Sequence, residues 1–260
     1  MEIILTDTHS HIYLEEFDKD RDEVVYNSLN QGVKYIFLPN IDSSSIENML
    51  NLSQKYVDKI FPMIGLHPSS VEDDYKNELD EVLSYLKKEK FYAIGEIGLD
   101  YYWNTTFKEE QQTVFEKQLH LAMQENLPAI IHVRDAFDDV IKILSKPEYD
   151  NLKGILHCFT GNLEQAKFFI DRGLKLGIGG IVTFKNAGLD KLVEQISLND
   201  IVLETDSPYL APMPKRGKRN ESTYLRYIAK KVAELKQVSI AEVAKITTKN
   251  AEEVFKINLK

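Results

Sequence analysis

The chain has 260 residues, of which 43% are hydrophobic and 28% charged, which excludes a disordered protein and fits a globular fold with a substantial core. Its net charge of -9 excludes a protein that coats DNA through a broad cationic surface, although a local basic patch remains compatible with a nucleic-acid substrate. Cys158 is the only cysteine, which excludes an intrachain disulfide and a cysteine-based zinc site.

Short β-branched runs alternate with amphipathic stretches along the whole chain, and we predict eight strands, each short and apolar as buried parallel strands are. The strands lie near residues 3–6, 33–38, 60–64, 92–95, 129–133, 154–156, 174–178 and 201–203. A helix is expected after each strand. The clearest helices cover residues 18–31, 43–56, 108–126 and 162–172.

Eight alternating units in about 250 residues match the size of a (β/α)8 TIM barrel, an α/β fold. The alternative is a doubly wound open sheet, whose nucleotide fingerprint G-x-G-x-x-G is missing, because the run that starts at Gly177 has Val182 at its last position. We therefore predict one TIM-barrel domain over residues 1–260, of the metal-dependent hydrolase type.

The first residues of the sequence indicate the cellular compartment of the protein. The first seven residues have no basic stretch, their apolar run is too short for a signal peptide, and no later stretch approaches a membrane span. Together with the lone cysteine, this predicts a cytoplasmic protein that does not enter a membrane. We expect it to be a monomer.

Side chains of metal-binding types stand at the ends of five predicted strands. His9 and His11 follow the first strand, and the period of two in an extended chain points both the same way. The other candidates end the fourth, fifth, sixth and eighth strands: Glu96, His132, His157 and Asp206. In a parallel barrel these ends form one rim around one pocket, where barrel active sites lie.

Each of these residues has a structural interpretation when taken alone, because a histidine that ends an apolar strand is often a hydrogen-bonded core residue. As a set they favour metal binding, since a buried cluster of four imidazoles and two carboxylates would be poorly satisfied without a cation. Six ligands suit two divalent cations and hydrolysis. We assign one cation to His9, His11, Glu96 and Asp206 and the other to Glu96, His132 and His157.

The ligand types also indicate the metal and the roles. Four imidazoles favour zinc, manganese or a related ion over magnesium, which prefers oxygen. Glu96 is expected to bridge the cations, and Asp206 is placed to accept a proton from the attacking water as general base. Glu204 has the strand parity of Asp206 and is expected to orient a ligating histidine.

An ordered set of motifs resembles the TatD family of metal-dependent deoxyribonucleases. The motifs are His9-Ser10-His11 and residues 65–68, 95–100, 131–134, 157–161, 204–208 and 216–221. The resemblance implies an amidohydrolase-type barrel, a divalent-metal centre at the six positions, and phosphodiester cleavage in DNA. Ser222 departs from the pattern, since many members have proline there, which bears on loop rigidity more than on chemistry. We expect exonucleolytic action on single strands or ends.

Several residues are candidates for substrate contacts. Arg134 suits bidentate phosphate binding or a salt bridge at the rim, and His67 suits a substrate oxygen or a turn. Tyr102, within Tyr101–Trp103, suits base stacking or a packed lid. Lys215 and Arg216, in a proline-broken loop over 207–219 that also contains Lys218 and Arg219, suit a phosphate backbone or solvent.

Other functions remain open at this point. The same centre suits a barrel hydrolase of a small amide, lactone or ester, or of aminoacyl-tRNA esters, because a fold does not determine a substrate. A nucleic-acid-binding scaffold with a vestigial site is disfavoured, because all six ligand positions are filled by ligand types. Cys158 is expected to be a small core residue.

Overall fold

A computed structural model describes residues 3–103 and 105–259 and confirms the expected barrel architecture. Residues 1, 2, 104 and 260 of the domain predicted over 1–260 lie outside this description. The strands that it contains are β1 Leu5–Asp7, β2 Val33–Pro39, β3 Ile60–Met63, β4 Ile94–Asp100, β5 Ala129–Arg134, β6 Gly154–Leu156, β7 Lys175–Ile178 and β8 Ile201–Leu203. All eight predicted strands are therefore present.

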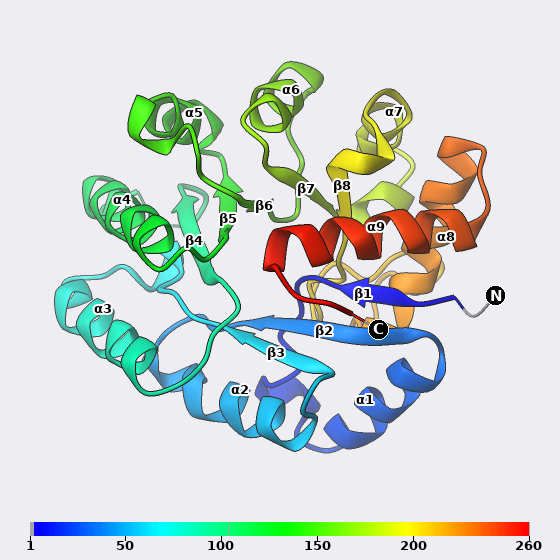
Figure 1. Ribbon diagram of the computed structural model, residues 1–260, viewed down its shortest axis with the longest axis horizontal. Helices are drawn as coiled ribbons and strands as arrows, with labels where there is room; N and C mark the ends of the chain where they lie inside the picture. Colours follow the sequence, from blue (N-terminus) through cyan, green and yellow to red (C-terminus); the bar gives the residue numbers. More distant parts are fainter. Residues whose placement is uncertain (1–2, 104, 260) are drawn as a thin grey trace.

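Helices lie around the strands and, in one case, across the end of the barrel (Figure 1). They are α1 Arg21–Asn30, α2 Ser43–Lys55, α3 Tyr75–Ser84, α4 Lys108–Gln124, α5 Phe137–Leu144, α6 Leu163–Asp171, α7 Leu189–Gln195, α8 Leu225–Lys236 and α9 Ile240–Phe255. Local signals set several boundaries. The Asn162 side chain accepts a hydrogen bond from the backbone N–H of Gln165 at 2.9 Å and caps α6. Gly32 follows α1 with φ +96°, a conformation that glycine adopts readily.

The barrel closes through two short junctions. Parallel pairing joins β1, β2 and β3 in one group and β4 to β8 in another. Isolated parallel bridges pair Ile64 with Ile94 and Ser10 with Ser207. At the second junction the backbone N–H of Asp206 also donates to the carbonyl of His9 at 2.9 Å. The first and last strands therefore meet directly beside the predicted metal ligands.

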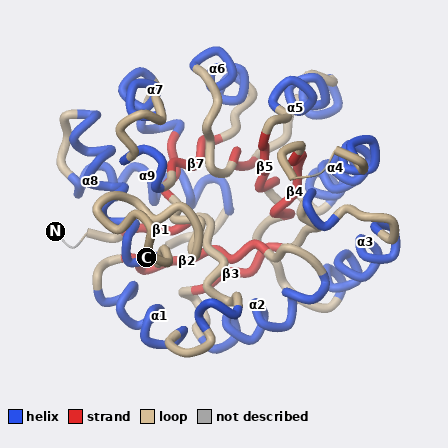
Figure 2. The backbone as a smooth tube through the Cα atoms, turned by 180° about the vertical axis from the view of Figure 1, so that it is seen from behind, coloured by secondary structure: helices blue, strands red, loops and turns tan. Residues whose placement is uncertain are grey.

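The barrel interior has an apolar layer at the amino ends of the strands. Ile130, Ile155 and Val202 lie in it, packed with Phe37 and with Phe255 from α9. The rings of Phe37 and Phe255 stack with their centroids 3.7 Å apart. Figure 1 views the barrel from its amino end, where α9 crosses the middle. Figure 2 is turned by 180° and views the barrel from its carboxyl end. Helix α9 therefore covers the amino end, and the carboxyl end remains open for a site.

The fourth strand differs from its prediction. It was expected to end at residue 95 before Glu96, but β4 continues to Asp100 because residues 97–100 pair with residues 131–134 of β5. Glu96 therefore lies inside a strand rather than at its end. Within the described ranges, no helix is both long enough and apolar enough to span a bilayer.

Candidate metal centre

The segment that carries His9 and His11 is fastened to the end of β8 by a buried carboxylate. Both oxygens of Asp7 accept hydrogen bonds from Thr205, from the hydroxyl at 2.6 Å and from the backbone N–H at 2.9 Å. Burial raises the pKa of Asp7 to about 7, although these hydrogen bonds act in the opposite direction. This tie holds the ends of β1 and β8 in one place.

Glu96 stands at the middle of the cluster, and its two oxygens face different histidines. Oε2 lies 3.1 Å from Nε2 of His9 and 3.5 Å from Nε2 of His11. Oε1 lies 2.8 Å from Nδ1 of His132 and 3.6 Å from Nε2 of His157. The side chain is buried. The two oxygens of Glu96 therefore face different sets of histidines, and its bridging role stays a prediction.

Asp206 completes the group from the opposite wall. Its Oδ1 lies 3.6 Å from Nε2 of His11 and 3.9 Å from Nε2 of His157. Burial raises the pKa of Asp206 to about 6, while the imidazoles of His157 and His11 act in the opposite direction. The structure therefore brings together all six residues that the sequence assigned to the centre.

Hydrogen bonds place the proton of His11 away from the centre. The Tyr13 hydroxyl donates its proton to the carbonyl of Pro39 at 2.6 Å. The same hydroxyl lies 3.0 Å from Nδ1 of His11, and it has only its acceptor lone pairs left for this contact. His11 therefore carries its ring proton on Nδ1. Its Nε2 presents a lone pair toward Glu96.

His132 and His157 have comparable partners behind them. Nε2 of His132 lies 3.0 Å from Oδ2 of Asp100, and Nδ1 of His157 lies 3.0 Å from Oε1 of Glu204. Burial opposes the charge on Asp100, but the hydrogen bond from His132 lowers the pKa of this carboxyl group. A carboxylate behind an imidazole favours a proton on the rear nitrogen and a lone pair on the front one. Glu204 thus has the contact expected of a residue that orients a ligating histidine.

The donor set fits divalent cations. Nε2 of His9 lies only 3.1 Å from Nε2 of His11, so two ring nitrogens converge beside one carboxylate oxygen. Among the described residues, Nδ1 of His9 is buried without a hydrogen-bond partner. Groups of ligand atoms that lie within 4.8 Å of one another include His9 with His11 and Asp206, and His9 with Glu96 and His157. Since His157 also approaches His9, its assignment to the second cation stays a prediction.

Comparison with known proteins identifies the family. The family described as TatD related DNase matches residues 6–256. The chain belongs to the TatD family. With its buried cluster of ligand types, it is a metal-dependent hydrolase of that family.

Individual TatD relatives extend along the whole length. The "Uncharacterized metal-dependent hydrolase YabD" of Bacillus subtilis is 41% identical over 256 residues and covers 98% of this chain and 100% of the relative. The "3'-5' ssDNA/RNA exonuclease TatD" of Salmonella typhimurium is 33% identical over 249 residues, covering 93% and 95%. The crystal structure of the TatD homologue YJJV from Escherichia coli superposes with a TM-score of 0.92 at 27% identity, covering 99% and 100%.

In this TatD-family chain, His67 faces the centre with a defined tautomer. Its Nδ1 accepts a hydrogen bond from the backbone N–H of Ser69 at 3.1 Å, so the ring proton of the neutral form lies on Nε2. That nitrogen lies 3.4 Å from Oε1 of Glu96. Burial lowers the pKa of His67, although Glu96 acts in the opposite direction. His67 therefore stabilises its turn and also presents an N–H to the pocket.

The three rings of residues 101–103 divide into two environments. The Tyr101 hydroxyl donates to Asp139 at 3.0 Å, and this ring is packed in the loop. Tyr102 is exposed, and the guanidinium of Arg134 lies 3.7 Å above its ring. Within the described residues Arg134 has no ion-pair partner, so it is not part of a salt bridge at the rim. Stacked on Tyr102, it remains free to bind an anion.

The basic loop over 207–219 has two parts. Arg219 pairs with Asp20 at 2.6 Å and with Glu221 at 3.3 Å, so it anchors the loop. The side chains of Lys215 and Arg216 lie over aromatic rings, at 5.2 and 4.3 Å from the ring centroids. Neither of the two lines the pocket at the metal centre. Any contact they make with a substrate therefore lies outside the pocket.

Two corrections concern pocket residues. Cys158 lines the pocket instead of the core, because the chain turns there with φ +46°. Asp100 was not assigned to the site, yet it holds His132 and lines the same pocket. The signal for Asp100 was present, since it shares the period-two face of Glu96 in β4.

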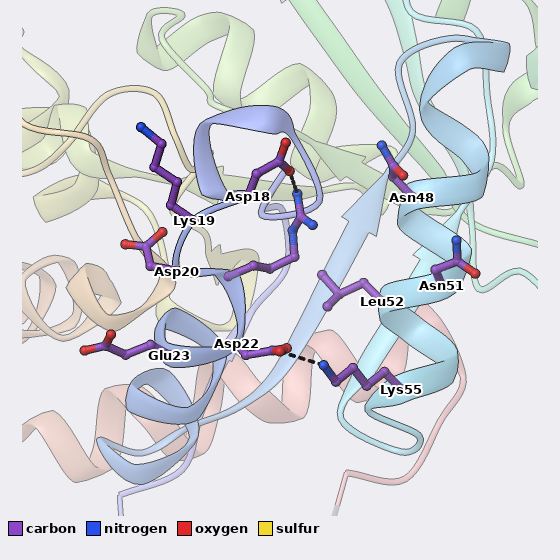
Figure 3. A pocket seen from close by; sticks show the side chains of 10 residues that line it. Asp18, Lys19, Asp20, Asp22, Glu23, Asn48, Asn51, Leu52 and Lys55 are labelled. Atoms are coloured by element: carbon purple, nitrogen blue, oxygen red, sulfur yellow. Dashed lines mark hydrogen bonds and ion pairs between the residues drawn. The ribbon is translucent and has the colours of Figure 1, made fainter.

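A second hollow, of about 470 Å³, lies between the start of α1 and α2 (Figure 3). Its charged side chains are largely paired with each other, as in the contacts of 2.6 Å from Asp18 to Arg21 and from Asp22 to Lys55. Exposed ion pairs of this kind contribute little and need no ligand. We therefore place the functional site at the metal centre.

Proposed function

We propose that this TatD-family hydrolase cleaves phosphodiester bonds in DNA, from the end of a single strand, at a centre of two divalent cations. The proposed ligands are His9, His11, Glu96, His132, His157 and Asp206. The observation that carries the proposal is Glu96, whose two oxygens face different histidines. The ring protons of His11 and His132 have acceptors on the side away from Glu96, and a carboxylate oxygen of Glu204 lies 3.0 Å from the rear nitrogen of His157.

The substrate class is supported by the pocket and by a relative. A pocket of about 680 Å³ lies over the centre, within the range that holds a small ligand or a piece of one strand. The Salmonella typhimurium protein named as a 3'-5' ssDNA/RNA exonuclease is 33% identical over most of the chain. Both favour an unpaired nucleic-acid end as substrate.

The proposed reaction gives each side chain one task. When bound, the cations act as Lewis acids toward the phosphoryl group and make water a stronger nucleophile. Asp206 accepts a proton from the water that attacks phosphorus, and the leaving alkoxide takes up a proton from solvent as its P–O bond breaks. The Nε2–H of His67 donates to a phosphoryl oxygen. Arg134 binds the phosphate of the neighbouring nucleotide with its planar guanidinium.

Metal analysis combined with product analysis tests this function. The protein is stripped with a chelator, reloaded with zinc or manganese, and assayed on end-labelled single-stranded DNA and RNA, on bis-nitrophenyl phosphate and on several lactones. We expect about two cations per chain, loss of cleavage on stripping and recovery on reloading, with mononucleotides released from one end. Lactone turnover without phosphodiester turnover would overturn the proposal, as would full nuclease activity in the stripped protein.

A further inference from the structure

The mouth of the pocket carries an unusual concentration of exposed apolar side chains. Eight large hydrophobic side chains of the described residues are exposed. Three of them line the pocket, namely Trp103, Tyr209 and Leu210, and two more, Tyr102 and Met213, belong to the same two short segments. Exposed apolar groups that cluster in this way, rather than scatter, indicate a binding surface.

The two segments stand on opposite walls. One follows β4 and the other follows β8, and strands four apart in an eight-stranded barrel face each other across its axis. Trp103 and Arg134 line one side of the pocket, while Tyr209 and Leu210 line the other. The metal centre lies on the floor between these walls.

The first wall is connected directly to the centre. One oxygen of Asp100 lies 3.0 Å from His132, and the other accepts a hydrogen bond from the backbone N–H of Tyr102 at 2.9 Å. The Tyr102 and Trp103 rings meet edge to face with their centroids 4.8 Å apart, and the guanidinium of Arg134 lies over both. Trp103 is 70% exposed, so most of its ring surface is available to a ligand.

The second wall is equally close to the centre. The ring of Tyr209 lies 6.2 Å from that of His11, and the backbone N–H of Tyr209 donates to the carbonyl of Asp206 at 2.7 Å. Asn220 donates to the Tyr209 carbonyl at 2.6 Å and holds this turn in place. The ring itself is 46% exposed. Both walls are therefore fixed relative to the candidate ligands.

We infer that Trp103 on one wall and Tyr209 on the other each stack an unpaired nucleobase, so that the phosphodiester joining the two nucleosides lies over the metal centre. Flat aromatic faces accept any base, whereas the guanidinium of Arg134, which lines the pocket, matches the charge of the backbone. A base inside a duplex is stacked on both faces by its neighbours and has no face left for either wall. This inference rests on the proposed function for the identity of the occupant and adds the two residues that hold its bases.

Fluorescence tests the first wall without any need for catalysis. Trp103 is the only tryptophan in the chain, so its emission reports directly on that wall. The zinc-loaded protein is titrated with a deoxyribonucleoside monophosphate and, in parallel, with deoxyribose 5-phosphate. We expect saturable quenching by the nucleotide and none by the sugar phosphate. Equal responses to both compounds, or no response to either, would overturn the assignment of Trp103.

Kinetics test both walls together. Trp103→Ala and Tyr209→Ala are each expected to lower kcat/KM on a single-stranded oligonucleotide about 10-fold, the effect of losing one stacked base. On a strand whose two terminal residues are abasic, the wild type should already be slow, and neither variant should be slower. Tyr26→Ala, which removes an exposed ring from α1, is the matched control and should leave both rates unchanged.

The outcomes separate this inference from the proposed function. Equal losses on normal and abasic strands would show a general effect on the site and would overturn the stacking role. If the wild type cleaves no phosphodiester at all, the proposed function fails, and the fluorescence titration still decides whether Trp103 stacks a base.

Discussion

The amino and carboxyl halves of the barrel interior are built from the same strands but from opposite kinds of side chain. Ile130 lies two residues before His132, and Ile155 lies two residues before His157, on the same inward face. The apolar half packs against α9, whereas the other half gathers carboxylates and imidazoles. In β5 and β6, two positions therefore separate an apolar residue that stabilises the barrel from a histidine that is costly to bury without a cation.

Glu96→Gln breaks the polar half with the largest expected effect. The amide keeps the volume but cannot bridge two cations, so kcat/KM should fall at least about 10³-fold, or about 4 kcal/mol. Metal content should decrease while the circular dichroism spectrum stays that of the folded protein. Elemental analysis and steady-state kinetics check this. Full metal content with an unchanged rate would contradict the bridging role.

Phe37→Ala breaks the apolar half instead. Phe37 is fully buried and stacks on Phe255 of α9, so the cavity should lower the free energy of unfolding by at least about 3 kcal/mol. Below the unfolding transition, metal content should stay at the wild-type value because the ligands are untouched. Denaturant titration measures the first effect, with Phe37→Leu as a milder control. Loss of metal without loss of stability would show that the two halves are not separable.

Arg219→Ala tests whether the loop over 207–219 also contributes to the free energy of unfolding. The guanidinium pairs with Asp20 and Glu221 and is only partly exposed, so its removal should cost about 1 kcal/mol. Arg219→Lys keeps the charge but loses the planar fork and should recover only part of this. Thermal unfolding of the three proteins decides the matter. Identical melting temperatures would mean that the loop is not anchored by this pair.

Lys218→Ala should have the smallest effect. Lys218 is exposed on the same loop, so stability should not change. If this lysine contacts one phosphate, the slope of log KM against log salt for single-stranded DNA should decrease by about 0.7. Kinetics at several salt concentrations test this, and an unaltered slope would remove Lys218 from the substrate path.

The parts predicted from sequence were those with a local signal. Each strand is a short apolar run, and the six candidate ligands follow such runs with the expected parity. Asp100 was missed because β4 was ended at residue 95, although Ile97 and Leu99 continue its buried alternation. The period of two places Asp100 on the same face of the strand as Glu96.

Long-range contacts could not be predicted in this way. Arg219 was grouped with phosphate-binding residues, but its partner Asp20 is 199 residues away in the chain. Tyr101 and Tyr102 are neighbours of identical chemistry, but Tyr101 meets Asp139 and Gln112 and is packed, whereas Tyr102 is exposed. Whether a side chain is paired, packed or exposed thus depends on which distant segment of the chain packs beside it.

The junction between β1 and β8 has a consequence for biosynthesis. His9 and His11 emerge from the ribosome early, but Asp206 and the Thr205 hydroxyl that holds Asp7 emerge almost 200 residues later. A nascent chain therefore carries an incomplete centre through most of its translation. Under the proposed function, cleavage cannot begin before the polypeptide is nearly finished, which protects nucleic acid near the ribosome from a half-made enzyme.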